Sequence, residues 1–73
     1  MLKITAYGKI GDEYKPLFLR IRKDRVLMYE EAVNNPRTPP GVMSVITWLG
    51  GDDREKFTMS QESIQELDRQ IEA

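Results

Sequence analysis

The C-terminal part of the chain constrains the fold most strongly, because strand, turn, strand and helix signals follow one another there. Residues 45–49 (VITWL) and residues 56–59 (KFTM) carry the β-branched and aromatic side chains typical of strands. The glycines and aspartates of residues 50–53 supply a turn between them. Ser60 predicts the N-cap of a helix that runs almost to Ala73. We therefore expect a β-hairpin followed directly by a helix.

The predicted helix has a narrow apolar stripe made of Ile64, Leu67 and Ile71, spaced three and four residues apart. Met59 before the expected N-cap and Ile64 after it have the spacing of a hydrophobic staple. A helix of about 12 residues is marginal alone in water. The stripe therefore predicts that the helix packs on the sheet or on another chain.

The N-terminal part predicts two further strands. Residues 2–7 alternate apolar and polar side chains, and the two glycines of residues 8–13 indicate a turn. Residues 17–22 predict a second strand, with Leu17, Leu19 and Ile21 on one face and Phe18, Arg20 and Arg22 on the other. Pro16 is compatible with the start of a strand or with an edge strand, but not with a central one.

The middle of the chain is less clearly patterned. Residues 26–29 (VLMY) predict a third strand, or an extension of the second strand beyond a bulge. Residues 30–32 fit a short helical turn as an alternative. Residues 34–41 hold three of the four prolines and predict an exposed, extended and mobile loop.

Together these elements predict one small α+β domain over residues 1–73, with an antiparallel sheet of four to five strands and one C-terminal helix. A small SH3-like barrel capped by the helix is the alternative. We expect the core to be built from apolar side chains of every element: Leu2, Ile4, Leu17, Leu19, Ile21, Val26, Met28, Val45, Leu49, Phe57, Ile64, Leu67 and Ile71.

Composition excludes several classes of site. The 73 residues include no cysteine and no histidine, which removes disulfides, thiolate metal sites and the usual general base. We expect no catalytic residue, no cofactor and no metal. So small a core often needs external support, and an open sheet edge invites pairing, so we expect a homodimer or an obligate protein partner. No apolar stretch is long enough to span a membrane, and we expect a cytoplasmic protein.

Charge is unevenly distributed along the chain. The formal net charge is −1, but residues 1–37 carry eight Lys or Arg against five Asp or Glu, and residues 38–73 carry three against seven. Such polarity steers charged partners and favours antiparallel self-association. Ordinary solvated surface charge is the simpler interpretation.

The candidate contact residues are cationic or aromatic. Arg20, Arg22, Lys23 and Arg25 form the densest basic cluster, which indicates a solvated sheet face, a weak nucleic-acid contact or a contact with an acidic protein patch. Arg37 lies in a PxxP pattern, which an ordinary connecting loop also explains. Trp48 either sits in the core beside Phe57 or lies on the face opposite Val45 and Leu49; an exposed Trp48 would be the principal contact residue.

Three segments of the chain resemble the small flagellar-operon proteins of the FlbD type and similar short bacterial and phage accessory proteins. Residues 1–5 (MLKIT) resemble their first strand, residues 45–51 (VITWLGG) their strand and glycine turn, and residues 56–64 (KFTMSQESI) the strand that enters a helix at a serine. The resemblance implies a small accessory or regulatory protein that acts through contacts and has no catalytic residues. We therefore expect a non-enzymatic protein-interaction or regulatory module, with a nucleic-acid-binding accessory protein as the alternative.

Overall fold

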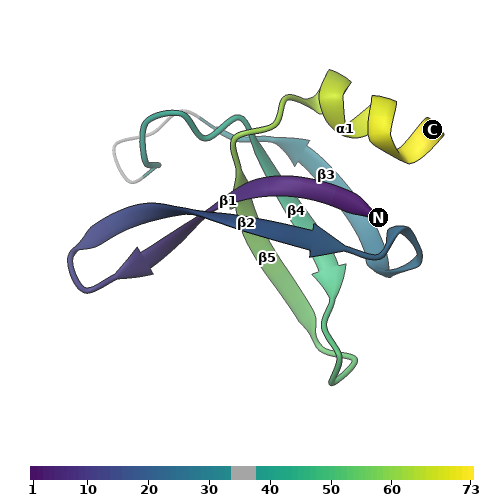
Figure 1. The fold of residues 1–73 in the computed structure, drawn as a ribbon, viewed down its shortest axis with the longest axis horizontal. Coiled ribbons are helices and arrows are strands. Elements are labelled where there is room, and N and C mark those ends of the chain that lie inside the picture. The colour runs from purple at the N-terminus through teal and green to yellow at the C-terminus, as the bar shows by residue number, and fades with distance from the viewer. Residues whose placement is uncertain (34–37) are drawn as a thin grey trace.

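The protein is a five-stranded antiparallel sheet with one C-terminal helix, which confirms the predicted α+β class (Figure 1). The computed structural model describes residues 1–33 and 38–73. The strand order is β2-β1-β5-β4-β3, so the sheet is open, with β2 and β3 at its edges, and it does not close into the barrel considered as the alternative. The elements are β1 Leu2–Ile10, β2 Glu13–Ile21, the 3-10 turn η1 Lys23–Arg25, β3 Val26–Glu31, β4 Ser44–Leu49, β5 Glu55–Ser60 and α1 Ile64–Glu72.

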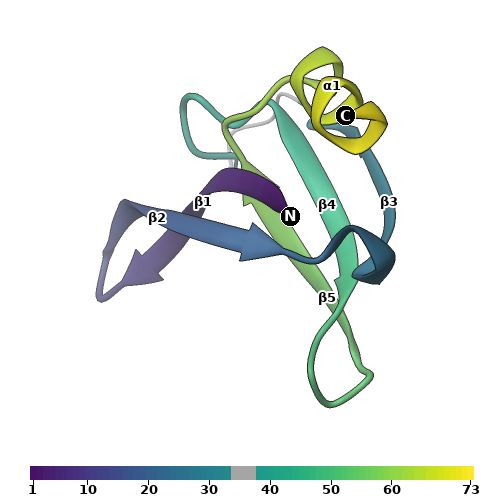
Figure 2. The same ribbon diagram turned by 45° about the vertical axis from the view of Figure 1, so that its right-hand side comes forward.

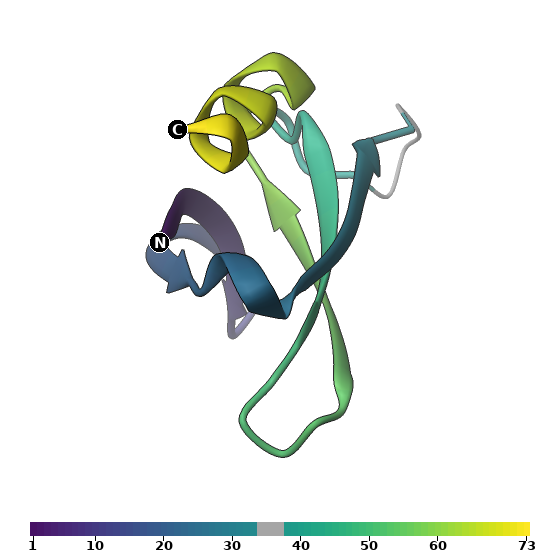
Figure 3. The ribbon, with the colours of Figure 1, turned by 90° about the vertical axis from the view of Figure 1, so that its right-hand side faces the viewer.

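Two long hairpins, β1–β2 and β4–β5, cross and extend away from their crossing point (Figure 2). β1 and β2 pair along their whole length, from Leu2 opposite Ile21 to Ile10 opposite Glu13. β1 and β5, in contrast, share only the pair Ala6 and Ser60. The sheet therefore folds at this junction, and β1–β2 and β3–β4–β5 form two sides with the core between them (Figure 3).

The C-terminal segment takes the place of β5 along the N-terminal half of β1. The backbone N–H of Gln61 donates to the Thr5 carbonyl over 2.9 Å, and the Thr5 N–H donates to the Glu62 carboxylate. The Gln70 side-chain amide then bonds the Lys3 backbone twice, accepting from its N–H over 2.7 Å and donating to its carbonyl over 2.8 Å. Backbone groups of β1 that would otherwise be unpaired are thereby satisfied.

The core lies on the inner face of the folded sheet, beneath α1. Its fully buried apolar side chains come from β1, β2, β4 and α1, and further apolar side chains pack against them. The predicted core residues that belong to this core are Leu2, Ile4, Leu19, Ile21, Val26, Ile64, Leu67 and Ile71, and Ala6, Ile46, Tyr29 and Trp48 join them.

The first two strands are longer than predicted. The turn between them is only Gly11 and Asp12, and Gly11 has a φ of 64°, which glycine adopts without strain. Pro16 lies within β2, which is an edge strand as Pro16 requires. The prediction of Leu17 as a core residue was wrong: its side chain is on the core face of β2, but 45% of it is exposed because this end of the hairpin extends beyond the core.

A bulge in β3 explains a second wrong core prediction. Val26 pairs with Trp48, but Met28 pairs with Thr47, so the register shifts between Val26 and Met28. The extra residue turns Met28 to the outer face, where it is 51% exposed, and turns Tyr29 inward. β3 is thus a separate third strand, and it continues through Glu30 and Glu31, where a helical turn had been the alternative.

Register also places Phe57 outside the core. Phe57 pairs with Thr47 in the β4–β5 hairpin. Two residues further along the strands, Val45 pairs with Met59 on the same outer face. Phe57 is 71% exposed, so its prediction as a core residue was wrong. Val45 and Leu49 are half-buried on this same outer face, so their prediction as core residues was also wrong, and Ile46 takes the central core position instead.

The helix begins later than predicted. Its N-cap is Ser63, whose hydroxyl accepts from the Glu66 N–H over 3.2 Å, and the staple expected between Met59 and Ile64 does not fit that start. Ser60 instead ends β5, fully buried, with its hydroxyl accepting from the Glu62 N–H over 3.0 Å. No helix in the described ranges has the length and apolar character needed to cross a membrane.

Residues 34–37 of the proline-rich loop lie outside the described residues, so the predicted mobility of that part stays a prediction. The remainder of the loop is held in place. Pro39 is buried, the Tyr7 hydroxyl donates to the Pro40 carbonyl over 2.8 Å, and Gly41 has a φ of 90°. A Cβ at Gly41 would come within 2.7 Å of the Tyr7 hydroxyl oxygen, so a larger residue would disturb this contact.

Candidate contact surfaces

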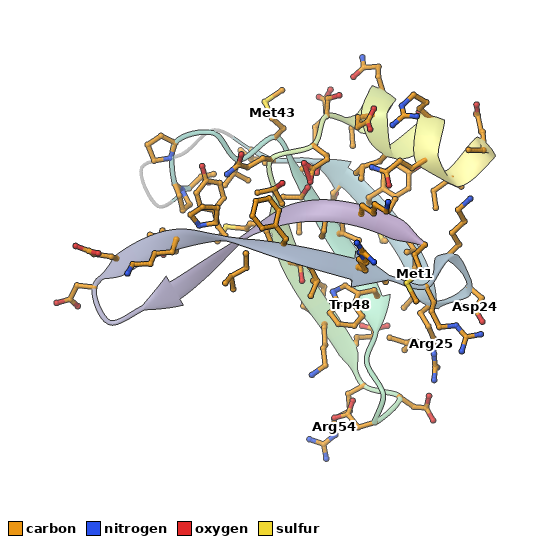
Figure 4. All side chains as sticks on the ribbon, viewed as in Figure 1. Met1, Asp24, Arg25, Met43, Trp48 and Arg54 are labelled. Atoms are coloured by element: carbon orange, nitrogen blue, oxygen red, sulfur yellow. The ribbon has the colours of Figure 1, made fainter. Side chains whose placement is uncertain are left out.

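One open groove collects most of the predicted contact residues. It has a volume of about 310 Å³ and lies between the end of β2, the 3-10 turn and the end of β4. Trp48 and Arg25 lie close together beside it (Figure 4). The 3-10 turn holds Arg22 and Arg25 near each other through the bond from the Arg25 N–H to the Arg22 carbonyl. The groove is lined by Arg20, Ile21, Arg22, Arg25, Trp48, Leu49 and Gly51.

Neighbouring carboxylates neutralise part of the positive charge of this groove. Arg22 forms an ion pair with Asp24 over 3.1 Å, and Arg25 forms one with Asp53 over 2.8 Å. Arg20 has no such partner among the ion pairs of the described residues. Both pairs are solvent-accessible and therefore exchange readily with other anions.

Trp48 is on the face opposite Val45 and Leu49, as one of the two predicted placements has it, and it also packs against the core. Its indole N–H donates to the Thr58 hydroxyl over 2.8 Å, across the hairpin. Phe57 is on the other face of the sheet and does not share its surroundings. Trp48 is half-buried, so it offers a partner only the part of its surface that borders the groove.

The other two predicted contact residues are not in the groove. The Lys23 ammonium group donates to the Ala73 carbonyl over 2.7 Å, on the side of the molecule where α1 ends. Arg37 lies outside the described residues. The 3-10 turn therefore divides the basic cluster of residues 20–25, because it directs consecutive side chains to different sides of the molecule.

A second surface was not predicted from the sequence. Met28, Val45, Phe57 and Met59 surround Thr47 on the outer side of β3, β4 and β5, and we call these residues the outer apolar face. Phe57 and Met28 are the most exposed of them, whereas Thr47 is buried between its neighbours with 7% exposure. An apolar surface of this kind on a small monomeric domain commonly marks a site of contact.

The outer apolar face continues into a hollow and is bordered by negative charge. The hollow, of about 280 Å³, is lined in part by Val42, Val45 and Met59. Glu30 and Glu31 line it as well, and Glu55 stands at the other end of the face, opposite Leu49 in the β4–β5 pairing. All three carboxylates are exposed, and none of them takes part in an ion pair among the described residues.

The sequence does contain a signal for this surface. Residues 45–49 are apolar at nearly every position, and a strand that carries apolar side chains on both faces is typical of a strand covered on both sides. In this structure α1 and the β1–β2 hairpin cover only the inner face of β4. Among the residues that the structure describes, the outer face therefore lacks the cover that the sequence pattern indicates.

Within residues 1–33 and 38–73, no group of three or more carboxylates is arranged so that it could hold a metal ion. No family model, no curated protein and no solved structure matches this chain. The resemblance to FlbD-type proteins therefore stays a prediction.

Proposed function

We propose that this protein is a non-enzymatic interaction module that binds a protein partner through its outer apolar face. The observation that carries the proposal is the exposure of Phe57 and Met28 on either side of the buried Thr47. A contiguous group of exposed apolar side chains lowers solubility unless a partner covers it, whereas single exposed apolar side chains are ordinary on protein surfaces. The regulatory or accessory role that the sequence resemblance implies is compatible with such a module.

Two further features support a contact role over catalysis. The chain has no histidine or cysteine, which are the most common general bases and the strongest neutral-pH nucleophiles. Every buried side-chain nitrogen and oxygen atom in the described part of the chain has a hydrogen-bond partner. A buried polar atom without a partner is one indication of a catalytic role, and the described residues contain none.

Site-specific photo-crosslinking in cells that express the protein tests this proposal. A photoreactive phenylalanine analogue at position 57 should give crosslinked products of higher mass, because this side chain would be covered by the partner. The same analogue at position 18 provides the matched control, because Phe18 is 88% exposed on β2, away from this face. Equal crosslinking from both positions, or none from position 57, would contradict the proposal.

The basic groove supports a second candidate function, the binding of nucleic acid. The convergence of Arg20, Arg22 and Arg25 on Trp48 is the observation that favours it. Cationic side chains beside an aromatic ring bind single strands through charge and base stacking. However, two of the three arginines already pair with aspartates, and the net charge is −1, so we expect weak and non-specific binding.

Fluorescence anisotropy with a labelled single-stranded oligonucleotide tests the groove. Three phosphate contacts give a slope of only about −2 in a plot of log affinity against log salt. We expect binding no tighter than micromolar at physiological salt. Nanomolar binding that disappears in the Arg20→Glu/Arg22→Glu variant, but persists in Lys15→Glu on the same strand, would establish nucleic-acid binding instead.

A further inference from the structure

The shape and charge of the outer apolar face restrict the class of partner that it can take. The face is apolar at its centre, where Phe57, Met28 and Met59 surround Thr47. Its border is acidic, because Glu30 and Glu55 are exposed at its two ends without an ion pair among the described residues. A partner that covers this face must therefore bring apolar side chains flanked by positive charge.

We propose that the outer apolar face binds an amphipathic helix whose apolar stripe is flanked by lysine or arginine. This inference rests on the proposed function, since it names the partner class for the same face. The helix would lie across the strands, with apolar side chains on Phe57 and Met28 and cations near Glu30 and Glu55.

The spacing of the two most exposed side chains fits a helix. Met28 and Phe57 are on strands that flank β4, and both pair with Thr47. Two inter-strand steps separate them by about 10 Å. Helix residues seven positions apart lie on one face and are also about 10 Å apart along the axis. One stripe can therefore contact both side chains, while an intermediate residue fills the space above Thr47.

A second copy of the chain is a poorer occupant of this face. Two outer apolar faces packed against each other would bring two sets of Glu30 and Glu55 together, which is unfavourable. The apolar stripe of α1 is not free to dock on another copy, because Leu67 is fully buried and Ile64 and Ile71 pack against the core. The acidic border thus selects a basic partner.

The test uses a synthetic leucine–lysine helix as the probe, with leucines three, four and seven positions apart, titrated into the isotope-labelled full chain. Amide shifts should change along β3, β4 and β5. Replacement of Phe57 by serine should weaken binding at least about tenfold, the usual effect of removing a central aromatic contact. The Phe18→Ser variant is the matched control and should bind like the wild-type protein.

Charge is tested separately from apolar contact. The Glu30→Lys/Glu55→Lys variant should bind about tenfold more weakly and lose its salt dependence, because the charge attraction is gone. A leucine–glutamate helix should not bind. Equal binding of both helices, shift changes confined to β1 and β2, or an effect of Phe18→Ser as large as that of Phe57→Ser would overturn the proposal.

The oligomeric state of the protein separates a second copy from a helical partner. If the wild-type mass rises with concentration, falls to that of a monomer in Phe57→Ser, and the basic helix does not bind, the occupant is a second copy and the helix proposal is wrong. Failure of the helix to bind while crosslinks from position 57 persist would reject the helix class alone. Loss of those crosslinks would reject the face itself as a contact surface.

Discussion

Leu67→Ala is the most informative stability variant, because Leu67 is the one buried residue of α1 and has no exposed surface. Its side chain belongs to the same cluster as Leu2, Ile4 and Ile46, so it joins the helix to both sides of the folded sheet. A helix of 9 residues does not persist in water without such packing. Truncation of this side chain should therefore weaken the whole domain and not the helix alone.

The magnitude follows from the buried carbon atoms. Leucine to alanine removes three carbons, each worth about 0.8 kcal/mol of transfer free energy, or roughly 2.4 kcal/mol. A residual cavity adds to this cost, and α1 can move only partly to fill it because Gln70 and Asp68 bond it to β1 and β3. We expect a loss of about 2–4 kcal/mol. A domain of this size has only roughly 4–11 kcal/mol of stability in total.

Urea denaturation, followed by circular dichroism and by Trp48 fluorescence, measures this loss. The midpoint should fall while the dependence of the unfolding free energy on urea stays constant. Gln65→Ala is the matched control, since this helix residue is exposed and its replacement should change stability by less than about 0.5 kcal/mol. A midpoint for Leu67→Ala equal to that of wild type would refute the packing argument.

Three further predictions concern bonds that join distant parts of the chain. Gln70→Ala should cost about 1–2 kcal/mol and speed hydrogen exchange at the Lys3 amide, because both bonds to the Lys3 backbone are lost; unchanged exchange would contradict this role. The Tyr29 pKa is raised mainly because its hydroxyl donates to Asp68, with further contributions from burial and from the charges of Asp68 and Glu72. The resulting stabilisation is present below pH of about 10 and is lost as pH rises through the folded-state pKa; ultraviolet titration of wild type against Tyr29→Phe should show it, and an ordinary Tyr29 pKa would refute it. We also propose a homodimer through the free edge of β3, with a light-scattering mass near twice 8.5 kDa that Glu31→Pro reduces; a concentration-independent monomer would exclude it.

The fold class and the β4–β5 hairpin were predictable, and Pro16 excluded a central strand, because each depends on local pattern. Strand alternation placed Leu2, Ile4, Leu19 and Ile21 correctly on the inner face. Alternation cannot detect a register shift, and the bulge between Val26 and Met28 is set by pairing with β4, which is distant in sequence. Prediction failed for Met28 for that reason.

The start of the helix shows a different limit. Two serines, Ser60 and Ser63, both fit a capping role, and both hydroxyls accept a nearby backbone N–H. Glu66 follows Ser63 at the spacing of a capping box, and this spacing is the sequence signal for Ser63 as the N-cap. Ser60 could not begin the helix because β5 continues to it in the pairing with Ser44, a long-range constraint.

The candidate site was predictable only in part. A cluster of cations in sequence indicated Arg20, Arg22, Lys23 and Arg25, and the structure places all of these except Lys23 along one groove. The outer apolar face combines residues from three strands, and its membership depends on the register of two separate pairings. A single sequence contains no direct measure of such register, so the apolar run of residues 45–49 indicates an apolar outer side of β4 without identifying its neighbours on β3 and β5.

The two sheet edges, and the part of β1 that β5 does not pair with, differ in what they can offer another chain. In the N-terminal half of β1, the side chains of Gln70 and Glu62 bond the free backbone groups and take the place of a neighbouring strand. At the β2 edge Pro16 is opposite Tyr7, and proline supplies no N–H for a further strand. At β3 the Ala32 N–H points to Met43 in the β4 direction, so alternation leaves the backbone groups of Tyr29 and Glu31 pointing outward. Because the bulge ends the regular part of this edge at Met28, only a short stretch remains for strand pairing, and the outer apolar face is the larger surface for a partner.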